Sequence, residues 1–531
     1  MSPDSATGMG LDLIFLLVAL PLGGGFLLPL FDKLREESRL RLKEKEVIAL
    51  GITLASAGLA WASFGREGIY WMSGWPPPLG INLVVDGLSA LMLVVINSIA
   101  FLVMIYSFKY MEDYTPGGKY YSLFLLMLAG MNGVVLTGDM FNLYVFLEIA
   151  SIASYALVGY RRGGVELEAA FKYLILGAIG SAFILFGVGL LYAATGNLNM
   201  AQIALILNAA EQGEGEGALM MRGIASAFFL VGFGLKAALV PFHAWLPDAH
   251  SSAPTPISAM LSGVLIKALG VYCLARVFFN VIGIDPILGN LLIWAGALSM
   301  VVGALLAIGQ EDLKRLLAYS SISQVGYIVL ALGMGGVLLS RSRGGGEEAL
   351  GLAGLALLGG IFHLVNHATN KALLFLSSGA VEQQAQTRQL GEMGGLFHRM
   401  PLTGSTTLFG VLSIAGIPPF AGFWSKLIII IAALLGRFYA ATGLLIVVSV
   451  LTLAYYMRVE REAFFGAAPE RLARVGVREA SAIMGLPTAV LALGVVGLGL
   501  LYLPGVREMV LDRVVDVLLE GTNYAQMVLG G

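Results

Sequence analysis

Apolar stretches long enough to cross a bilayer recur from one end of this 531-residue sequence to the other. A helix needs about 20 predominantly apolar residues to span the hydrocarbon core. Only 12% of the residues are charged, whereas soluble domains carry about 25%, so a chain of this length cannot cover itself with a wetted surface. The sequence therefore predicts an all-α integral membrane protein, because backbone groups in lipid must be satisfied within each segment.

Counting apolar runs between polar or Gly/Pro breaks predicts about fourteen transmembrane helices. We expect every segment to be helical and expect the first run to be a retained span, because no basic residue precedes it as in a signal peptide. The expected cores are residues 11–30, 47–64, 83–108, 121–138, 140–160, 170–193, 223–246, 257–280, 286–308, 314–337, 352–380, 403–433, 441–465 and 482–503.

Basic residues concentrate in alternate loops. Of the 32 lysines and arginines, 19 fall in the loops on one side and 8 in those on the other, with Lys314 assigned to the first set and Arg276 to the second. The positive-inside rule then places both termini on the outer side of a cytoplasmic (inner) membrane. We expect residues 196–222 to be an external loop with a short interfacial helix, and residues 507–520, which are too charged to span, to lie on the outer surface or on a neighbouring subunit.

Five lysines remain within the apolar spans: Lys172, Lys236, Lys267, Lys371 and Lys426. A lysine at the bilayer centre costs about 2.5 to 3.5 kcal/mol on insertion scales. Burial disfavours the charged ammonium and a nearby carboxylate favours it, so a buried lysine can switch between two protonation states and pass protons along. The alternative is that the long side chains snorkel to the interface, and Lys172 is the most open to that interpretation.

Glu148 is the matching acid, midway along its predicted span. We expect it to pair with Lys236 and to serve in proton transfer. The alternative is a structural salt bridge that locks two helices together.

Prolines follow or precede three of these lysines: Pro241 comes after Lys236, Pro254 and Pro256 precede Lys267, and Pro418 and Pro419 precede Lys426. Proline removes a backbone donor, so we expect broken helices there. Breaks at membrane depth are tolerated where they line hydrated cavities, although a plain kink is the alternative.

His363 and His367 stand two turns and one turn before Lys371, on one helical face. Histidine titrates near neutral pH, so this polar stripe is typical of a proton path. Core histidines satisfied by their neighbours are the alternative, and a metal site is disfavoured because no third ligand is evident. His243, Asp248 and His250 lie near the end of a span and are candidates for an entrance, or else ordinary loop residues.

The sequence does not support a disulfide, a cofactor site, a nucleotide site or a nucleic-acid-binding surface. The single cysteine, Cys273, cannot form an internal disulfide or a thiolate cluster. No phosphate-binding GxxxxGK[ST] loop is present, no flavin, haem or nicotinamide site is indicated, and the net charge of −2 argues against nucleic acid. We expect no cofactor, no metal and no catalytic residue in this chain.

Four motifs carry a family resemblance: GDMFNLYVFLE at residues 138–148, LKAALVPFHAWLPDAH at 235–250, APTPISAM at 253–260 and DLKRLLAYSSISQ at 312–324. They resemble the antiporter-like subunits of respiratory complex I, Mrp Na⁺/H⁺ antiporters and membrane-bound hydrogenases, most closely the Mrp D-type and hydrogenase-type members. The resemblance covers nearly the whole chain.

The resemblance implies fourteen core helices with two inverted five-helix repeats, a Glu148–Lys236 pair, a central Lys267 and a distal Lys426. We therefore divide the chain into a three-helix segment (1–120), a first repeat (121–280), a second repeat (281–465) and a final helix with a short amphipathic tail (466–531). It also implies homologous membrane subunits as partners, and a complex that is an oxidoreductase in some members.

The leading hypothesis is a subunit that translocates protons, with sodium as a second candidate ion, through buried lysine, glutamate and histidine side chains. A stand-alone ion-coupled solute transporter is the alternative. A purely structural membrane anchor is disfavoured by the number of buried lysines.

Overall fold

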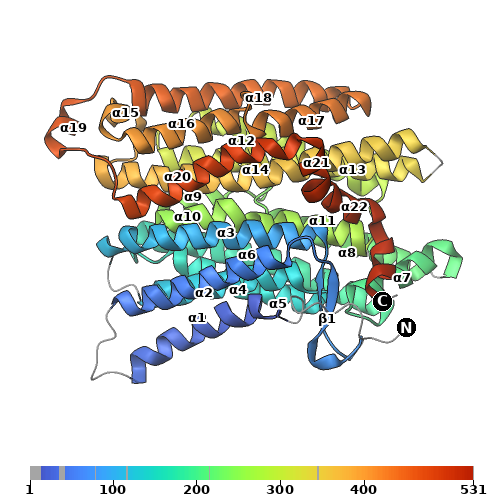
Figure 1. The fold of residues 1–531 in the computed structure, drawn as a ribbon. Coiled ribbons are helices and arrows are strands. Elements are labelled where there is room, and N and C mark those ends of the chain that lie inside the picture. The colour runs from blue at the N-terminus through green and yellow to red at the C-terminus, as the bar shows by residue number, and fades with distance from the viewer. Residues whose placement is uncertain are drawn as a thin grey trace.

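The computed structural model describes residues 13–34, 42–77, 79–114, 118–214, 216–343 and 346–529. Its long helices lie side by side along one common direction (Figure 1). Within those ranges, twelve helices are long and apolar enough to cross a membrane, and three shorter apolar helices accompany them, Leu16–Leu30, Pro401–Ala415 and Ala421–Leu435. The predicted helical membrane fold is confirmed, whereas the count of about fourteen spans is not.

The helices follow the predicted apolar runs closely. In the first half they are α1 (Leu16–Leu34), α2 (Leu42–Ser63), α3 (Gly87–Tyr110), α4 (Gly118–Leu136), α5 (Met140–Val158), α6 (Gly164–Thr195), α7 (Met200–Ala209), α8 (Glu216–Lys236), α9 (Trp245–Ser252), and the continuous helix Thr255–Val281, which includes α10 (Thr255–Met260) and α11 (Cys273–Ala275). In the second half they are α12 (Pro286–Ile308), α13 (Leu313–Ser342), α14 (Glu347–Ala385), α15 (Leu396–Arg399), α16 (Pro401–Ala415), α17 (Ala421–Leu435), α18 (Tyr439–Val459), α19 (Glu470–Val475), α20 (Ala482–Gly497), α21 (Pro504–Arg507), α22 (Arg513–Glu520) and α23 (Tyr524–Leu529).

Aspartates cap the start of several spans. Asp86 forms a capping box with Ser89 at the start of α3, and Asp139, Asp285 and Asp312 accept backbone N–H groups at the starts of α5, α12 and α13. These side chains satisfy N–H groups that have no partner within the helix. The polar breaks between apolar runs therefore mark the helix starts.

A short β-hairpin interrupts the helical pattern, and the expectation that every segment is helical is wrong there. Strand β1 (Gly68–Trp71) pairs antiparallel with β2 (Asn82–Val85) just before α3. The β-branched Val84 and Val85 favour a strand, and Asp86 then starts the helix, which shortens the predicted core 83–108. The hairpin lies at the ends of the spans. A two-stranded sheet leaves some backbone groups unpaired, and this is tolerated there because those groups are outside the hydrocarbon core.

Two predicted spans are broken, as the prolines indicate. α8 ends at Lys236 and the chain turns through Pro241 before α9 begins, so residues 223–246 do not form one helix. Residues 403–433 divide into α16 and α17 around Pro418 and Pro419. Pro254 and Pro256 instead mark a boundary, because Pro254 precedes the first residue of the helix Thr255–Val281 and Pro256 lies in its first turn.

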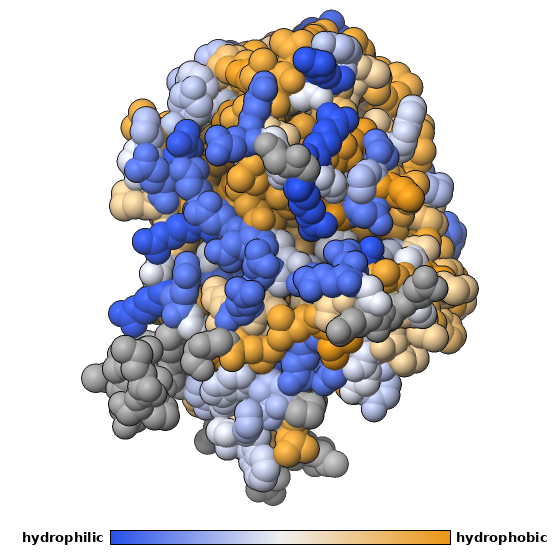
Figure 2. All heavy atoms as spheres, turned by 90° about the vertical axis from the view of Figure 1, so that its right-hand side faces the viewer, coloured by the Kyte–Doolittle hydropathy of each residue, from blue (hydrophilic) through white to orange (hydrophobic). Residues whose placement is uncertain are grey.

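The two ends of the bundle differ. We call the end that carries Arg161, Arg388, Arg458 and Arg471 the basic face, and the opposite end, with the hairpin, α7 and α22, the hairpin face. In Figure 1 the hairpin face is on the right, and both the start of α1 and helix α23 lie there. Figure 2 looks onto this face and shows hydrophilic side chains spread across it, with hydrophobic ones between them and toward the rim.

The amphipathic tail packs on its own chain. In α22 the apolar Val514, Val515, Val517 and Leu518 are buried, and the helix contacts α3, α14 and the end of the helix Thr255–Val281. α7 is largely buried as well and contacts α23. Neither α7 nor α22 is among the candidate membrane spans of the described residues, but residues 216–222 belong to α8, so the expected loop 196–222 is shorter than predicted.

The most enclosed helices lie at the centre. Every residue in the apolar windows of Thr255–Val281 and of α13 is buried, whereas well under half of the corresponding window is buried in α2 and α8. Charged side chains on the central helices are therefore held inside the protein.

Candidate ion path

Glu148 and Lys236 form the predicted acid–base pair. Lys236 Nζ lies 3.8 Å from Glu148 Oε1 and donates to Ser151 Oγ at 3.0 Å and to Tyr155 OH at 3.2 Å. The lysine side chain is 3% exposed and the glutamate side chain 25%, and Glu148 also accepts a hydrogen bond from Ser181. At this separation the ammonium is held mainly by neutral hydroxyls, so a small movement makes or breaks the ion pair.

The break after α8 is supported by side chains from neighbouring helices. Lys236 is the last residue of α8, and the preceding carbonyl, of Leu235, accepts from Trp245 Nε1 at 3.1 Å. The N–H of Val240 donates to Ser299 Oγ at 3.0 Å. These bonds satisfy some of the backbone N–H and C=O groups that lose their partners where the helix is interrupted. The break can therefore persist in the interior.

Lys267 is fully buried in the helix Thr255–Val281. Its ammonium donates to the carbonyl of Ser262. One turn further on, Gly270 lies against the chain after Lys236, since a Cβ at this glycine would be 2.5 Å from Ala237 Cα. The central lysine helix therefore packs directly on the break that holds Lys236.

The histidine stripe on α14 faces the interior. His363 Nδ1 lies 3.0 Å from Ser425 Oγ, and its Nε2 lies 3.1 Å from Gln324 Oε1. The ring of His367 is parallel to that of His363, with centroids 6.3 Å apart, and neither of its nitrogens has a hydrogen-bond partner among the described residues. A buried imidazole without partners is suited to taking a bridging water.

Lys371 continues the stripe one turn beyond His367. It is fully buried and donates to the Leu317 carbonyl at 2.8 Å and to Tyr456 OH at 3.0 Å. Both acceptors are neutral. Within the described ranges no carboxylate lies within ion-pair distance of this ammonium.

Lys426 lies at the second helix break. It donates to the Ile414 carbonyl at 2.8 Å, and its ammonium lies 5.0 Å from the centre of the Tyr327 ring. Ile414 is in the last turn of α16, where carbonyls lack partners within the helix and carry the negative end of its dipole. The break thus creates a site that favours a cation.

The histidines lie among the lysines. His363 lies beside Ser425, the neighbour of Lys426. Gly263, one turn before Lys267, packs against Ala368 and Ala372, the neighbours of His367 and Lys371. Together with the contact between Gly270 and Ala237, these contacts connect the helices that carry the four buried lysines into one line.

Lys172 does not join this line, and the expectation that it is buried is wrong. Its side chain is 48% exposed and forms ion pairs with Glu168 at 2.8 Å and Asp248 at 3.1 Å. It is on an exposed side of α6, next to Phe171, which is 64% exposed. Its long stem brings the ammonium to carboxylates outside the core, which is the snorkelling alternative.

The entrance candidates separate into surface and interior residues. Asp248 lies toward the surface and pairs with Arg315 at 2.8 Å. His250 is fully buried, stacks on Phe375 with centroids 4.7 Å apart, and has no hydrogen-bond partner on either nitrogen among the described residues. His243 is partly buried in the turn before α9. His250 is thus placed to reach the interior, and Asp248 to reach solvent.

Several residues of the site were missed from the sequence. The loop charge pattern places Lys314 and Arg276 in loops, yet their side chains are 1% and 4% exposed. Arg276 pairs with the buried Asp86 at 2.7 Å. Their positions inside the predicted cores 314–337 and 257–280 were the available signal, because a charge inside an apolar run indicates an interior role. Gln324 and Tyr456, which contact His363 and Lys371, carry no such signal.

Comparison with known proteins decides the family. The protein family described as "NADH:quinone oxidoreductase/Mrp antiporter, TM" matches residues 137–342 and 348–452. A second family, described as "NADH-Ubiquinone oxidoreductase (complex I), chain 5 N-terminus", matches residues 71–121. The chain belongs to the NADH:quinone oxidoreductase/Mrp antiporter family. The resemblance predicted from the four motifs is confirmed.

Relatives in this family span most of the chain. The N-type subunit of NADH-quinone oxidoreductase from Desulforudis audaxviator is 38% identical over 485 residues, covering 88% of this chain and 91% of that protein. The D-type subunit of the Na⁺/H⁺ antiporter from Alkalihalophilus pseudofirmus is 34% identical, covering 74% and 76%. A chain of the archaeal membrane-bound sulfane sulfur reductase complex matches with a TM-score of 0.83 and 32% identity, covering 97% and 100%. Such relatives are subunits of membrane complexes with several different subunits.

Proposed function

We propose that this chain is a proton-translocating subunit of a multisubunit membrane complex. The proton relay consists of Glu148, Lys236, Lys267, Lys371 and Lys426, with His363 and His367 between the last three lysines. Family membership supports the class of function, since the relatives include an Na⁺/H⁺ antiporter subunit and a quinone oxidoreductase subunit.

The observation that carries the proposal is a set of lysines held away from water and with few anionic partners. The side chains of Lys236, Lys267, Lys371 and Lys426 are all nearly or fully buried, and only Lys236 lies within 4 Å of a carboxylate in the described ranges. An ammonium without a counterion in a dry interior loses its proton readily, and recovers it when a carboxylate or water approaches. That exchange is what a proton relay needs.

Replacing either member of the first pair tests this. Lys236→Ala and Glu148→Ala, each in the assembled complex, are expected to abolish proton pumping, because each removes an exchangeable site. The measurement is quenching of a ΔpH-sensitive dye in inverted membrane vesicles, with assembly checked by co-purification of the partner subunits. Normal pumping by both variants would refute the assignment of the pair.

The nature of the ion is tested with the same vesicles. We expect a ΔpH signal in sodium-free buffer for a proton carrier, and a signal that requires added Na⁺ for an Na⁺/H⁺ exchanger. Robust solute uptake by the purified chain alone in liposomes would instead support the stand-alone transporter.

We propose further that the basic face is the inner side of a cytoplasmic membrane and that both termini are outside. The excess of lysine and arginine at that face supports this orientation. Inverted repeats at residues 121–280 and 281–465 are the proposed frame, supported by the two broken helices that bear Lys236 and Lys426. Protease protection of tags at each terminus in right-side-out vesicles tests the orientation.

A further inference from the structure

A pocket opens at the basic face, apart from the four buried lysines. Its volume is about 560 Å³. Tyr110 at the end of α3, Tyr160 and Arg161 after α5, and Glu382 and Gln383 in the last turns of α14 all line it. It therefore brings together the ends of three spans that are far apart in the sequence.

The carboxylate of Glu382 lines this pocket. The Glu382 side chain is 19% exposed, and its Oε2 lies 4.0 Å from Lys314 Nζ. Its Oε1 lies 4.0 Å from Arg388 Nε, and Oε2 has no hydrogen-bond partner among the described residues. Both separations exceed hydrogen-bond length, and so the carboxylate can accept a proton or a water without breaking a direct bond.

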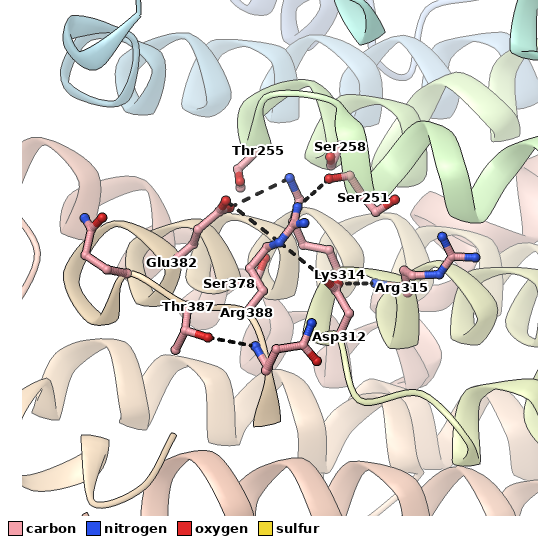
Figure 3. A network of polar contacts seen from close by, with 12 residues as sticks. Ser251, Thr255, Ser258, Asp312, Lys314, Arg315, Ser378, Glu382, Thr387 and Arg388 are labelled. Carbon is pink, nitrogen blue, oxygen red and sulfur yellow. Dashed lines mark hydrogen bonds and ion pairs between the residues drawn. The ribbon is translucent and has the colours of Figure 1, made fainter. Parts of the chain in front are cut away.

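Lys314 lies directly behind this carboxylate. Its side chain is 1% exposed, and its ammonium donates to the carbonyl of Ala253, at the end of α9, at 2.8 Å. Figure 3 shows Glu382, Lys314 and Arg388 pointing toward one another from α14, α13 and the segment after α14. The lysine thus stands between the pocket and the broken-helix region.

The line continues inward through His250. This imidazole stacks on Phe375 with ring centroids 4.7 Å apart, and Phe375 stands on α14 between Lys371 of the relay and Glu382 of the pocket. Neither of its nitrogens is hydrogen-bonded among the described residues, although the residue is fully buried.

Ion pairs around the pocket fix its geometry. Arg388 Nε lies 3.2 Å from Asp312 Oδ2, and Arg388 also donates to the carbonyl of Ser251. Asp312 caps α13 by accepting from the N–H of Arg315 at 3.0 Å. Arg388 therefore ties the end of α14 to α9 and to the start of α13, and holds Glu382 and Lys314 in register (Figure 3).

We propose that this pocket is the mouth through which protons reach the relay from the basic face, and that Glu382 and Lys314 are its proton-accepting pair. The inference rests on the proposed relay. It adds an entrance, an acceptor carboxylate and a fifth lysine that the relay itself does not contain.

The first experiment replaces the acceptor in the assembled complex. Glu382→Gln keeps the shape of the side chain but removes its proton exchange, so pumping is expected to fall on the order of tenfold and to require a lower pH on the basic face. Glu382→Asp is expected to recover part of the rate. Glu462→Gln is the matched control, because that carboxylate is 26% exposed, pairs with Arg458 on the same face and does not line the pocket.

The second experiment does not depend on the carboxylate. Gln386→Cys places a thiol at the exposed rim of the pocket, and Glu470→Cys places one on the same face at a residue that does not line the pocket, where the side chain is 95% exposed. The native Cys273 is buried and does not compete. A bulky cationic thiol reagent is expected to block pumping by the Gln386→Cys complex and to leave the Glu470→Cys complex unaffected.

Two results would overturn the entrance: parent-like pumping and pH dependence in Glu382→Gln, or undiminished pumping by a fully modified Gln386→Cys complex. If these changes reduced only the ΔpH signal that requires added Na⁺, the assignment of the pocket as a proton entrance would be overturned. A failure of the proposed relay gives a different result from a failure of the entrance. In that case the Lys236→Ala complex would pump normally, while the thiol reagent would still block pumping by the Gln386→Cys complex.

Discussion

At the scale of single residues, the buried lysines are distinguished by what surrounds them. Lys236 has a carboxylate at 3.8 Å, whereas Lys267 and Lys426 rest on backbone carbonyls and Lys371 on a carbonyl and a phenol. A neutral acceptor stabilises an ammonium less than a carboxylate does, so the sites away from Glu148 are the ones that can give up a proton most readily.

Tyr456 gives a sharp test at this scale. Tyr456→Phe removes one of two acceptors of Lys371, which costs the ammonium about 1–3 kcal/mol. We expect slower pumping with intact assembly. Tyr455→Phe is the matched control, because both hydroxyls bond Ser320, at 3.0 and 2.9 Å, but only that of Tyr456 accepts from Lys371. Equal rates in the two variants would show that the phenol does not tune Lys371.

At the scale of elements, the broken helices position the cations. α16 ends at a left-handed Gly416 (φ 88°), and α17 returns so close that a Cβ on Gly422 would lie 1.7 Å from the Ser413 carbonyl oxygen. This approach places Lys426 against the Ile414 carbonyl. The glycine is needed because backbone, rather than a movable side chain, occupies the space.

Gly422→Ala is therefore expected to separate α16 from α17 and to abolish pumping, with loss of stability in the purified complex. The control is Gly443→Ala on α18, where a Cβ meets nothing within 4 Å. A melting temperature and pumping rate for Gly422→Ala equal to those of the control would contradict the close packing of the break.

The buried pair Asp86–Arg276 joins the hairpin region to the tail. Arg276 also lies 5.1 Å from the Tyr524 ring, and the neighbouring Asn280 donates to the carbonyls of Val517 and Gly521 at 2.7 and 3.0 Å. Helix α22 and the turn after it are thereby held against the helix Thr255–Val281.

Asp86→Asn isolates the charge effect, because asparagine still caps α3. Leaving Arg276 buried without its counterion is expected to cost about 3–5 kcal/mol. The readout is the melting temperature of the detergent-solubilised complex. Asp285→Asn, another N-cap, for which no ion pair is found in the described ranges, is expected to have little effect; an equal loss in both would attribute the effect to capping.

At the scale of the whole molecule, the hydropathy pattern predicts the helical membrane fold and the family, and proline predicts both broken spans. Burial of Lys236, Lys267, Lys371 and Lys426 follows from their positions in apolar runs. The β-hairpin was missed because the apolar residues of its second strand continue directly into the apolar run of α3, so both were predicted as one helix. Lys172 was misplaced because a pattern of apolar residues does not tell which side of a helix faces outward.

The pocket at the basic face could not be predicted for a different reason. Glu382, Lys314 and Arg161 belong to separate spans, and only packing brings them together. From sequence alone, charges at the ends of spans indicate orientation but not which of them share a site.

Lys267 offers the most direct test of the relay, because it lies at its centre with a single backbone acceptor. Lys267→Met keeps the volume of the side chain and removes its exchangeable proton, and Cys273→Ser in the same helix is the control. In the reconstituted complex, measured by ΔpH formation, we predict that pumping is lost in Lys267→Met and retained in the control. Pumping at the parent rate by a fully assembled Lys267→Met complex would contradict a proton path through the buried lysines.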